Sequence, residues 1–133
     1  MRRDTWLPAA PEGVPQARAI VRELAGERRL DRGTTWELML ATTEAFANAV
    51  EHGRACDPRG IFLRAEAGDG QVGVEISDCG GCFPPTRRSS KGRGEGGRGM
   101  PIIAAIMDQL EVVPDTGRTR VRFAKRLALG SYS

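Results

Sequence analysis

Two short segments, residues 61–67 (IFLRAEA) and 71–77 (QVGVEIS), constrain the fold of this chain more strongly than any other feature. In both segments apolar and other side chains alternate, as in a strand that buries one face. The linker between them, GDG at residues 68–70, has the composition of a tight turn. These features predict a β-hairpin, and therefore an antiparallel sheet, in the middle of the chain.

The other segments group helices apart from strands. Apolar residues at helical spacing predict three helices, over residues 14–30, 36–52 and 100–110. Alternating segments predict three more strands, over residues 4–9, 110–114 and 118–127. Thr34 or Thr35 is the candidate N-cap of the second helix. This grouping indicates an α+β fold, a two-layer α/β sandwich whose mostly antiparallel sheet is covered by helices on one face.

Length and composition exclude several classes of protein. A chain of 133 residues is typical of one domain, and we expect a single domain over residues 1–133. A net charge of +3 and an aromatic share of 5% argue against nucleic-acid binding. The sequence has no apolar run of membrane-spanning length, and its first residues lack an apolar core, so we expect neither a transmembrane helix nor a secretory signal. Three cysteines, an odd number, argue against a disulfide framework, so we expect a cytoplasmic protein.

The helix predicted over residues 36–52 carries a polar stripe. Glu44, Asn48 and His52 follow one another at intervals of one turn and so share a face. A solvated face is the simple interpretation, but asparagine is a poor helix former in mid-helix. Its amide oxygen can ligate Mg²⁺, and a nearby carboxylate can accept a proton. We expect the sheet to contact a different stripe: Met39, Thr43, Phe46 and Val50.

Glycine and basic residues are concentrated between residues 83 and 99, where no apolar periodicity exists. We interpret this segment as a mobile loop that acts as a lid. Gly97 and Gly99 come directly before the third predicted helix, whose first backbone N–H groups can bind phosphate. Arg98 between them could reach a phosphate or simply keep the loop solvated. The pattern is neither the dinucleotide fingerprint nor a Walker A loop.

Three sequence boxes occur in a fixed order: EAFANAVEHG on a helix, ISDCGGCF after a strand, and GGRGMPIIAAIMDQLEV at the end of the loop. In this order and spacing they resemble the GHKL (Bergerat-fold) ATP-binding family, and more narrowly the RsbW-type anti-sigma-factor serine kinases of bacteria. The resemblance extends to the last strand and covers nearly the whole chain. It implies the Bergerat fold, an ATP lid at about residues 83–98, and ATP with Mg²⁺ as ligands.

The resemblance also implies roles for individual residues. Glu44 would be the general base toward a substrate serine, and Asn48 would coordinate Mg²⁺. Asp78 would accept a hydrogen bond from the adenine amino group, with Gly80 beside the base and Thr119 in support. The lid residues that would close over or contact the phosphates are Gly97, Arg98 and Gly99.

The cysteines permit a different interpretation. One histidine and three cysteines have the spacings of a structural zinc site: His52, Cys56, Cys79 and Cys82. That interpretation leaves the order of the three boxes unexplained, so we favour small residues that line a nucleotide pocket. Cys82 also stands where the family usually has the second glycine of D-x-G-x-G.

The function implied by the resemblance is that of an anti-sigma factor. Such a protein binds Mg-ATP, sequesters a sigma factor and phosphorylates a serine on an anti-anti-sigma (STAS-type) antagonist, commonly as a homodimer. The alternatives are a non-catalytic ATP-binding module that only sequesters a partner and the ATPase part of a histidine kinase. We expect no direct contact with nucleic acid or membrane. The exposed side of the first helix and the basic strand at residues 118–126 are both candidate partner surfaces.

Overall fold

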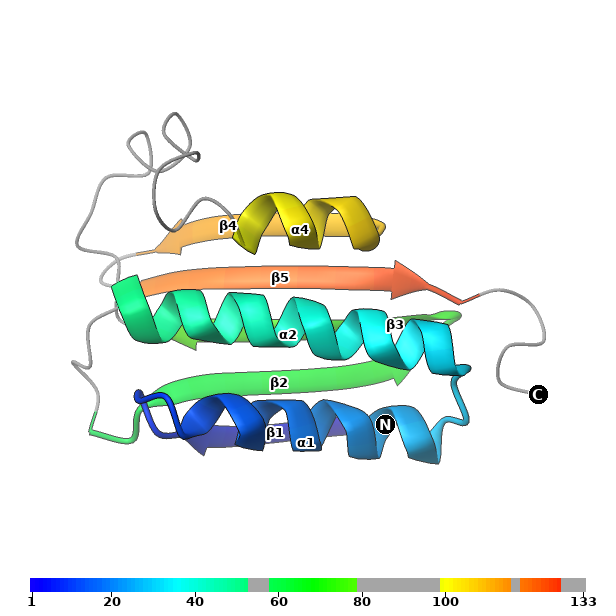
Figure 1. Cartoon of the computed structure of the whole chain (residues 1–133), viewed down its shortest axis with the longest axis horizontal. Helices are drawn as coiled ribbons and strands as arrows, with labels where there is room; N and C mark the ends of the chain where they lie inside the picture. Colours follow the sequence, from blue (N-terminus) through cyan, green and yellow to red (C-terminus); the bar gives the residue numbers. More distant parts are fainter. Residues whose placement is uncertain (53–57, 79–98, 116–117, 128–133) are drawn as a thin grey trace.

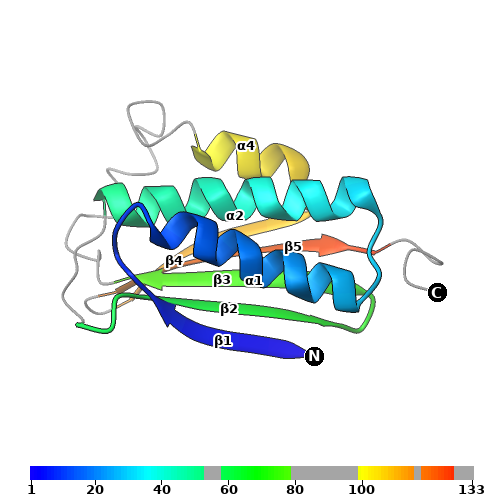
Figure 2. The same cartoon turned by 60° about the horizontal axis from the view of Figure 1, so that its bottom comes forward.

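The computed structural model describes residues 1–52, 58–78, 99–115 and 118–127. Along the chain the elements are β1 (Arg2–Leu7), α1 (Gly13–Glu27), α2 (Arg32–His52), β2 (Ile61–Gly68), β3 (Gln71–Asp78), α4 (Gly99–Ile106), β4 (Gln109–Asp115) and β5 (Arg118–Arg126). The strands form one antiparallel sheet of five strands in the order β1-β2-β3-β5-β4 (Figure 1). The described helices all cover the same face of this sheet (Figure 2). The predicted two-layer α+β sandwich is therefore confirmed.

The central hairpin forms as the alternating segments predict. In the β2–β3 pair Gly68 lies opposite Gln71, which leaves Asp69 and Gly70 as a two-residue turn. Both turn residues have positive φ, 53° for Asp69 and 76° for Gly70. This is the conformation of the type I′ turn, whose twist matches that of the paired strands. The turn thereby fixes which residues of β2 and β3 face the helices.

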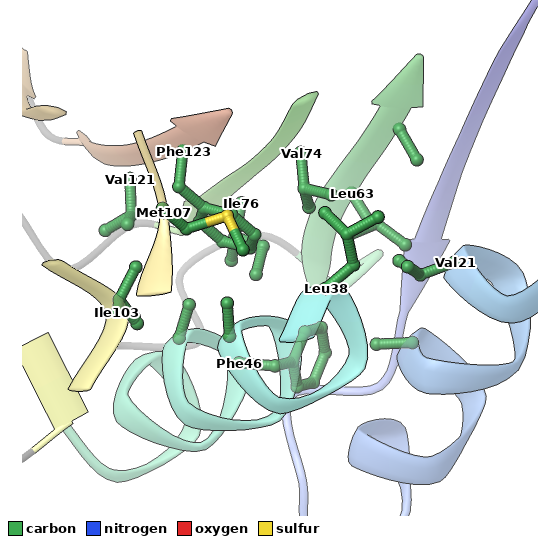
Figure 3. Packing of buried hydrophobic residues seen from close by; sticks show 14 of the residues in the cluster. Val21, Leu38, Phe46, Leu63, Val74, Ile76, Ile103, Met107, Val121 and Phe123 are labelled. Carbon is green, nitrogen blue, oxygen red and sulfur yellow. The ribbon is translucent and has the colours of Figure 1, made fainter. Parts of the chain in front are cut away.

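The hydrophobic core lies between the helices and the inner face of the sheet (Figure 3). Its members come from both layers, and Figure 3 labels Val21, Leu38, Phe46, Leu63, Val74, Ile76, Ile103, Met107, Val121 and Phe123. Phe46 is fully buried, and its ring approaches Gly13 so closely that a Cβ there would lie 2.8 Å from Cε1. Glycine at the first turn of α1 thus allows the two helices to meet. No described helix is long and apolar enough to cross a membrane.

Helix α2 is rotated relative to our expectation. Phe46 is buried as predicted, but Met39, Thr43 and Val50 are only partly buried. The other residues that pack most deeply are instead Leu38, Ala41, Thr42 and Ala45. The predicted stripe was wrong because α2 lies between α1 and α4 (Figure 1), so that its flanks as well as its base contact protein. Alanine at the base lets the helix approach the sheet closely.

The start of α2 also differs from the prediction. The helix begins at Arg32, and the carboxylate of Asp31 accepts a hydrogen bond from the backbone N–H of Thr34 at 3.2 Å. Asp31 therefore acts as the cap that we had assigned to Thr34 or Thr35. Hydrogen bonds from the side chain and backbone of Thr34 lower the pKa of Asp31. This capping contribution is present at neutral pH and is lost as the pH falls through the lowered pKa.

Helix α4 is shorter than the helix predicted over residues 100–110, because it ends at Ile106. The backbone N–H of Asp108 donates to the carbonyl of Ala124 at 3.0 Å, which brings the chain into the sheet just before β4. Pairing with β5 therefore takes up residues that apolar periodicity had assigned to a helix. Periodicity alone does not distinguish the two outcomes in so short an apolar run.

The outer face of the sheet bears a row of alternating charges. The strand register aligns one residue from each strand in the order Asp4, Arg64, Glu75, Arg122 and Glu111. Arg64 lies 3.2 Å from Asp4, and Arg122 lies 3.5 Å from Glu75 and 3.7 Å from Glu111. Ion pairs at or near the surface, such as these, contribute only about 0.2–1 kcal/mol each. The row nevertheless matches basic residues of β5 with acidic neighbours, which weakens the case for that strand as a partner surface.

Candidate functional site

Glu44 and Asn48 lie on the flank of α2 that faces α4. The direction of this flank is given by Glu37, whose carboxylate lies 2.8 Å from the Lys125 ammonium. The same ammonium donates to the carbonyl oxygen of Ile106 at the end of α4, also at 2.8 Å. Glu44 and Asn48 follow Glu37 by seven and eleven residues, so both point within about 20° of its direction. Both side chains are half-buried.

Asp78 and Thr119 form a buried polar pair where β3 ends and β5 begins. They are direct cross-strand partners, so their side chains share the inner face of the sheet. Only 8% of Asp78 and 7% of Thr119 is exposed. On the outer face, Arg118 donates to the hydroxyl of Ser77 at 3.1 Å, which connects the same two strand ends. A buried carboxylate beside a hydroxyl can bind an amine donor.

The folded chain brings these residues to one end of the molecule. The C-terminal end of α2, the end of β3 and the start of β5 lie at the left in Figure 1, and α4 begins on the same side of the molecule, nearer its middle. Asn48, Asp78, Thr119 and Gly99 therefore share this end although they are far apart in the sequence. The first backbone N–H groups of α4 point toward the same region, and helix N-termini attract phosphate. The arrangement can accommodate a ligand with an amine at one end and phosphates at the other.

Several predicted site residues lie outside the described residues. These are Gly80, Gly97, Arg98 and the three cysteines of the zinc interpretation, Cys56, Cys79 and Cys82. Within the part of the chain that the structure describes, no group of three or more His, Cys, Asp or Glu side chains could hold a metal ion. A single amide ligand at Asn48 still fits Mg²⁺, which commonly keeps its waters and takes its other ligands from substrate phosphates.

The opposite flank of α2 borders a groove against α1 with a volume of about 420 Å³. The groove is lined by Pro15, Arg18, Ala19, Arg22, Trp36, Met39, Leu40 and Thr43. Trp36 is 62% exposed, which is unusual for so large an apolar side chain. Sequence reasoning named the exposed side of the first helix but missed Trp36. A tryptophan at the start of a helix, outside its buried stripe, was the available signal.

The fold is also the one that a family model identifies. Residues 7–125 match the family model described as the histidine kinase-like ATPase domain, so the chain belongs to this family. The predicted relationship to GHKL proteins is confirmed.

Similar proteins narrow this class. The serine-protein kinase RsbW of Bacillus licheniformis is 27% identical over 125 residues, which span 84% of this chain and 78% of that protein. The structure of the RsbU and RsbW domains of Rv1364c from Mycobacterium tuberculosis matches 96% of this chain with a TM-score of 0.74 and 27% identity. This chain covers 32% of that larger chain. The RsbW-type resemblance is thus confirmed.

Two more distant structures share the fold. The histidine kinase domain of a blue-light activated histidine kinase from Erythrobacter litoralis EL346 has a TM-score of 0.59 at 18% identity, covering 90% of this chain and 62% of that chain. A chain of the SiaB–SiaC complex from Pseudomonas aeruginosa has a TM-score of 0.59 at 9% identity. The match covers 94% of this chain and 88% of that chain. At these identities the likeness concerns the fold alone.

Proposed function

We propose that this protein is an anti-sigma factor with serine/threonine-protein kinase activity. It binds Mg-ATP, sequesters a sigma factor and phosphorylates a serine on an anti-anti-sigma (STAS-type) antagonist. One observation carries the proposal: the buried Asp78–Thr119 pair shares one end of the fold with Asn48 and the start of α4. The similarity to RsbW supports a protein substrate in particular. A sigma-factor partner would place the protein in the cytoplasm.

Each site residue has a separate role in the proposed phosphoryl transfer. Asp78 would bind the adenine amino group with support from Thr119, and Asn48 would hold Mg²⁺, which would supply charge neutralisation for the transfer. Bound Mg-ATP supplies the transferable γ-phosphoryl group. Glu44 accepts the proton of the serine hydroxyl. The serine oxygen bonds to the γ-phosphorus, and the bond between the γ-phosphorus and the ADP oxygen breaks. Such transfer depends mainly on positioning and charge neutralisation, which the rigid elements of this fold can provide.

We extend the proposal to the parts of the chain beyond these elements. In this proposal residues 1–133 act as one domain, and residues 83–98 would serve as its ATP lid. Gly97, Arg98 and Gly99 would have the phosphate role that the resemblance implies, and Gly80 the role toward adenine. The protein acts as a homodimer, in line with what its RsbW-type sequence implies.

We place the partner-binding surface in the groove between α1 and α2. Arg18 and Arg22 lie one turn apart on α1, and both line the groove together with the exposed indole of Trp36. Charge complementarity favours an acidic amphipathic helix, whose apolar residues would contact Trp36 and Met39. The arginines of β5 are a weaker candidate because Glu75 and Glu111 lie among them.

Reversing one charge in this groove should weaken partner binding selectively. We expect Arg18→Glu to reduce affinity for a sigma factor from the same genome by at least about tenfold, since a like charge would face the acidic helix. Biolayer interferometry at two salt concentrations would measure the change. Arg126→Glu, at an exposed position at the end of β5, is the matched control. An equal loss in both variants would contradict the assignment of the groove.

Calorimetric titration with ATP in the presence and absence of Mg²⁺ tests the nucleotide site. We expect Mg²⁺ to strengthen binding by the wild type, and Asn48→Ala to remove most of that gain, roughly tenfold to 100-fold in affinity. Gln16→Ala removes an exposed amide from α1 and should bind like the wild type. A folded wild-type protein that does not bind ATP would refute the proposed function. The zinc interpretation would then be tested by metal analysis.

A further inference from the structure

Lys125 occupies a position that the proposed chemistry does not explain. It lies on the inner face of β5, where the alternating side chains are Thr119, Val121, Phe123 and Lys125. Its side chain is only 20% exposed, and its ammonium has two partners at 2.8 Å, the Glu37 carboxylate and the Ile106 carbonyl. A lysine retained among core residues needs such partners, because burial of an unpaired charge is costly.

The two partners join three elements at one point. Ile106 is the last residue of α4, so Lys125 supplies a cation and a donor to the C-terminal end of that helix. Glu37 belongs to the first part of α2 and holds the ammonium from the other side. The connection between α4 and β4 is also held to β5. The backbone N–H of Asp108 donates to the carbonyl of Ala124, and its carboxylate accepts from the backbone N–H of Arg126. The end of α4 is therefore fixed to both α2 and β5.

The apolar packing of α4 is limited to one side of the helix. Within residues 100–106, Ile103 is buried, Met100 and Ile106 are half-buried against the core, and Pro101, Ile102, Ala104 and Ala105 are exposed. A helix of eight residues is about 12 Å long and behaves as a rigid rod. Its orientation thus depends on the packing of Met100, Ile103 and Ile106 and on the polar contact that Lys125 makes at the C-terminal end. The other end, at Gly99, is the one that the proposed function assigns to the phosphates.

We infer that Lys125, held by Glu37, is a positioning residue for the nucleotide phosphates. It fixes the C-terminal end of α4 and thereby the direction in which the first N–H groups of the helix point. This inference rests on the proposed function. Lys125 would thus influence phosphate affinity from the C-terminal end of α4 without contacting the nucleotide.

Comparison of ATP with adenosine separates this role from a general loss of stability. We expect Lys125→Met to weaken ATP binding by about tenfold while adenosine affinity stays within about twofold, because Asp78 and Thr119 are untouched. Lys125→Arg keeps both contacts and should bind ATP like the wild type. The ATP affinity of Glu37→Gln should lie between that of Lys125→Met and that of Lys125→Arg. Arg126→Met, which removes the adjacent charge on the same strand, is the control.

Hydrogen exchange gives a readout independent of nucleotide. Amides of α4 should exchange faster in Lys125→Met than in the wild type, while those of α1 and β2 should not. Equal ATP affinity in Lys125→Met and the wild type, or equal losses for ATP and adenosine, would overturn the positioning role. If Lys125→Met does not fold, unchanged ATP affinity in Glu37→Gln would also overturn the positioning role. A wild-type chain that binds neither ligand would overturn the proposed function and, with it, this role.

Discussion

Replacement of Glu44 by glutamine should nearly abolish phosphoryl transfer while leaving ATP binding intact. A positioned general base contributes about 10²–10⁴-fold to a reaction rate, and glutamine cannot accept the hydroxyl proton. Glu44 is half-buried on the flank of α2 that faces α4, one turn before Asn48. Glutamine has nearly the same volume, so packing and affinity for Mg-ATP should change by no more than about twofold. Transfer of labelled γ-phosphate to an anti-anti-sigma protein from the same genome would measure the effect.

Glu23→Gln is the matched control for this variant. Glu23 is an exposed carboxylate on α1, away from the flank of α2 that faces α4, and its replacement should leave transfer unchanged. Transfer that survives Glu44→Gln would refute the assignment of Glu44 as the base. Wild-type protein that binds ATP and its partners but transfers no phosphate would instead identify a non-catalytic sequestering module. That outcome would leave the nucleotide site intact and remove only the kinase activity.

Replacement of Asp78 by asparagine should lower the affinity for ATP by about 100-fold, the order expected when a charge-assisted hydrogen bond is lost from a buried site. The same variant should narrow the preference for ATP over GTP. Guanine presents a carbonyl oxygen where adenine presents an amine, and the Asp78 carboxylate repels that oxygen. An asparagine amide can rotate and donate to it. Competition titrations with ATP and GTP would measure both effects.

Thr119→Val provides the comparison for Asp78→Asn. It preserves the shape of the buried side chain at the cross-strand position but removes its hydroxyl. We expect it to weaken ATP binding by less than Asp78→Asn does, without raising the relative affinity for GTP. Thermal unfolding of all variants shows whether a loss of affinity reflects the site or the fold. Unchanged selectivity in a folded Asp78→Asn protein would place adenine recognition elsewhere.

The sequence by itself determined the features that depend on neighbouring residues. Alternation in residues 61–67 and 71–77, with Asp69 and Gly70 between them, predicts the hairpin because strand period and turn conformation are local properties. The one-turn spacing of Glu44 and Asn48 likewise places them on one flank before any packing is known. The order of the three boxes was sufficient to predict the family.

Only the tertiary structure decided the features that depend on contacts between distant segments. The rotation of α2 follows from its position between α1 and α4, which no pattern within the helix records. Helix α4 ends early because Asp108 pairs with Ala124, far along the chain. Lys125 could be recognised as a half-buried partner of Glu37 and Ile106 only from the position of β5 beneath the helices. The packing free energy of the whole domain determines these features, because it outweighs local conformational propensity.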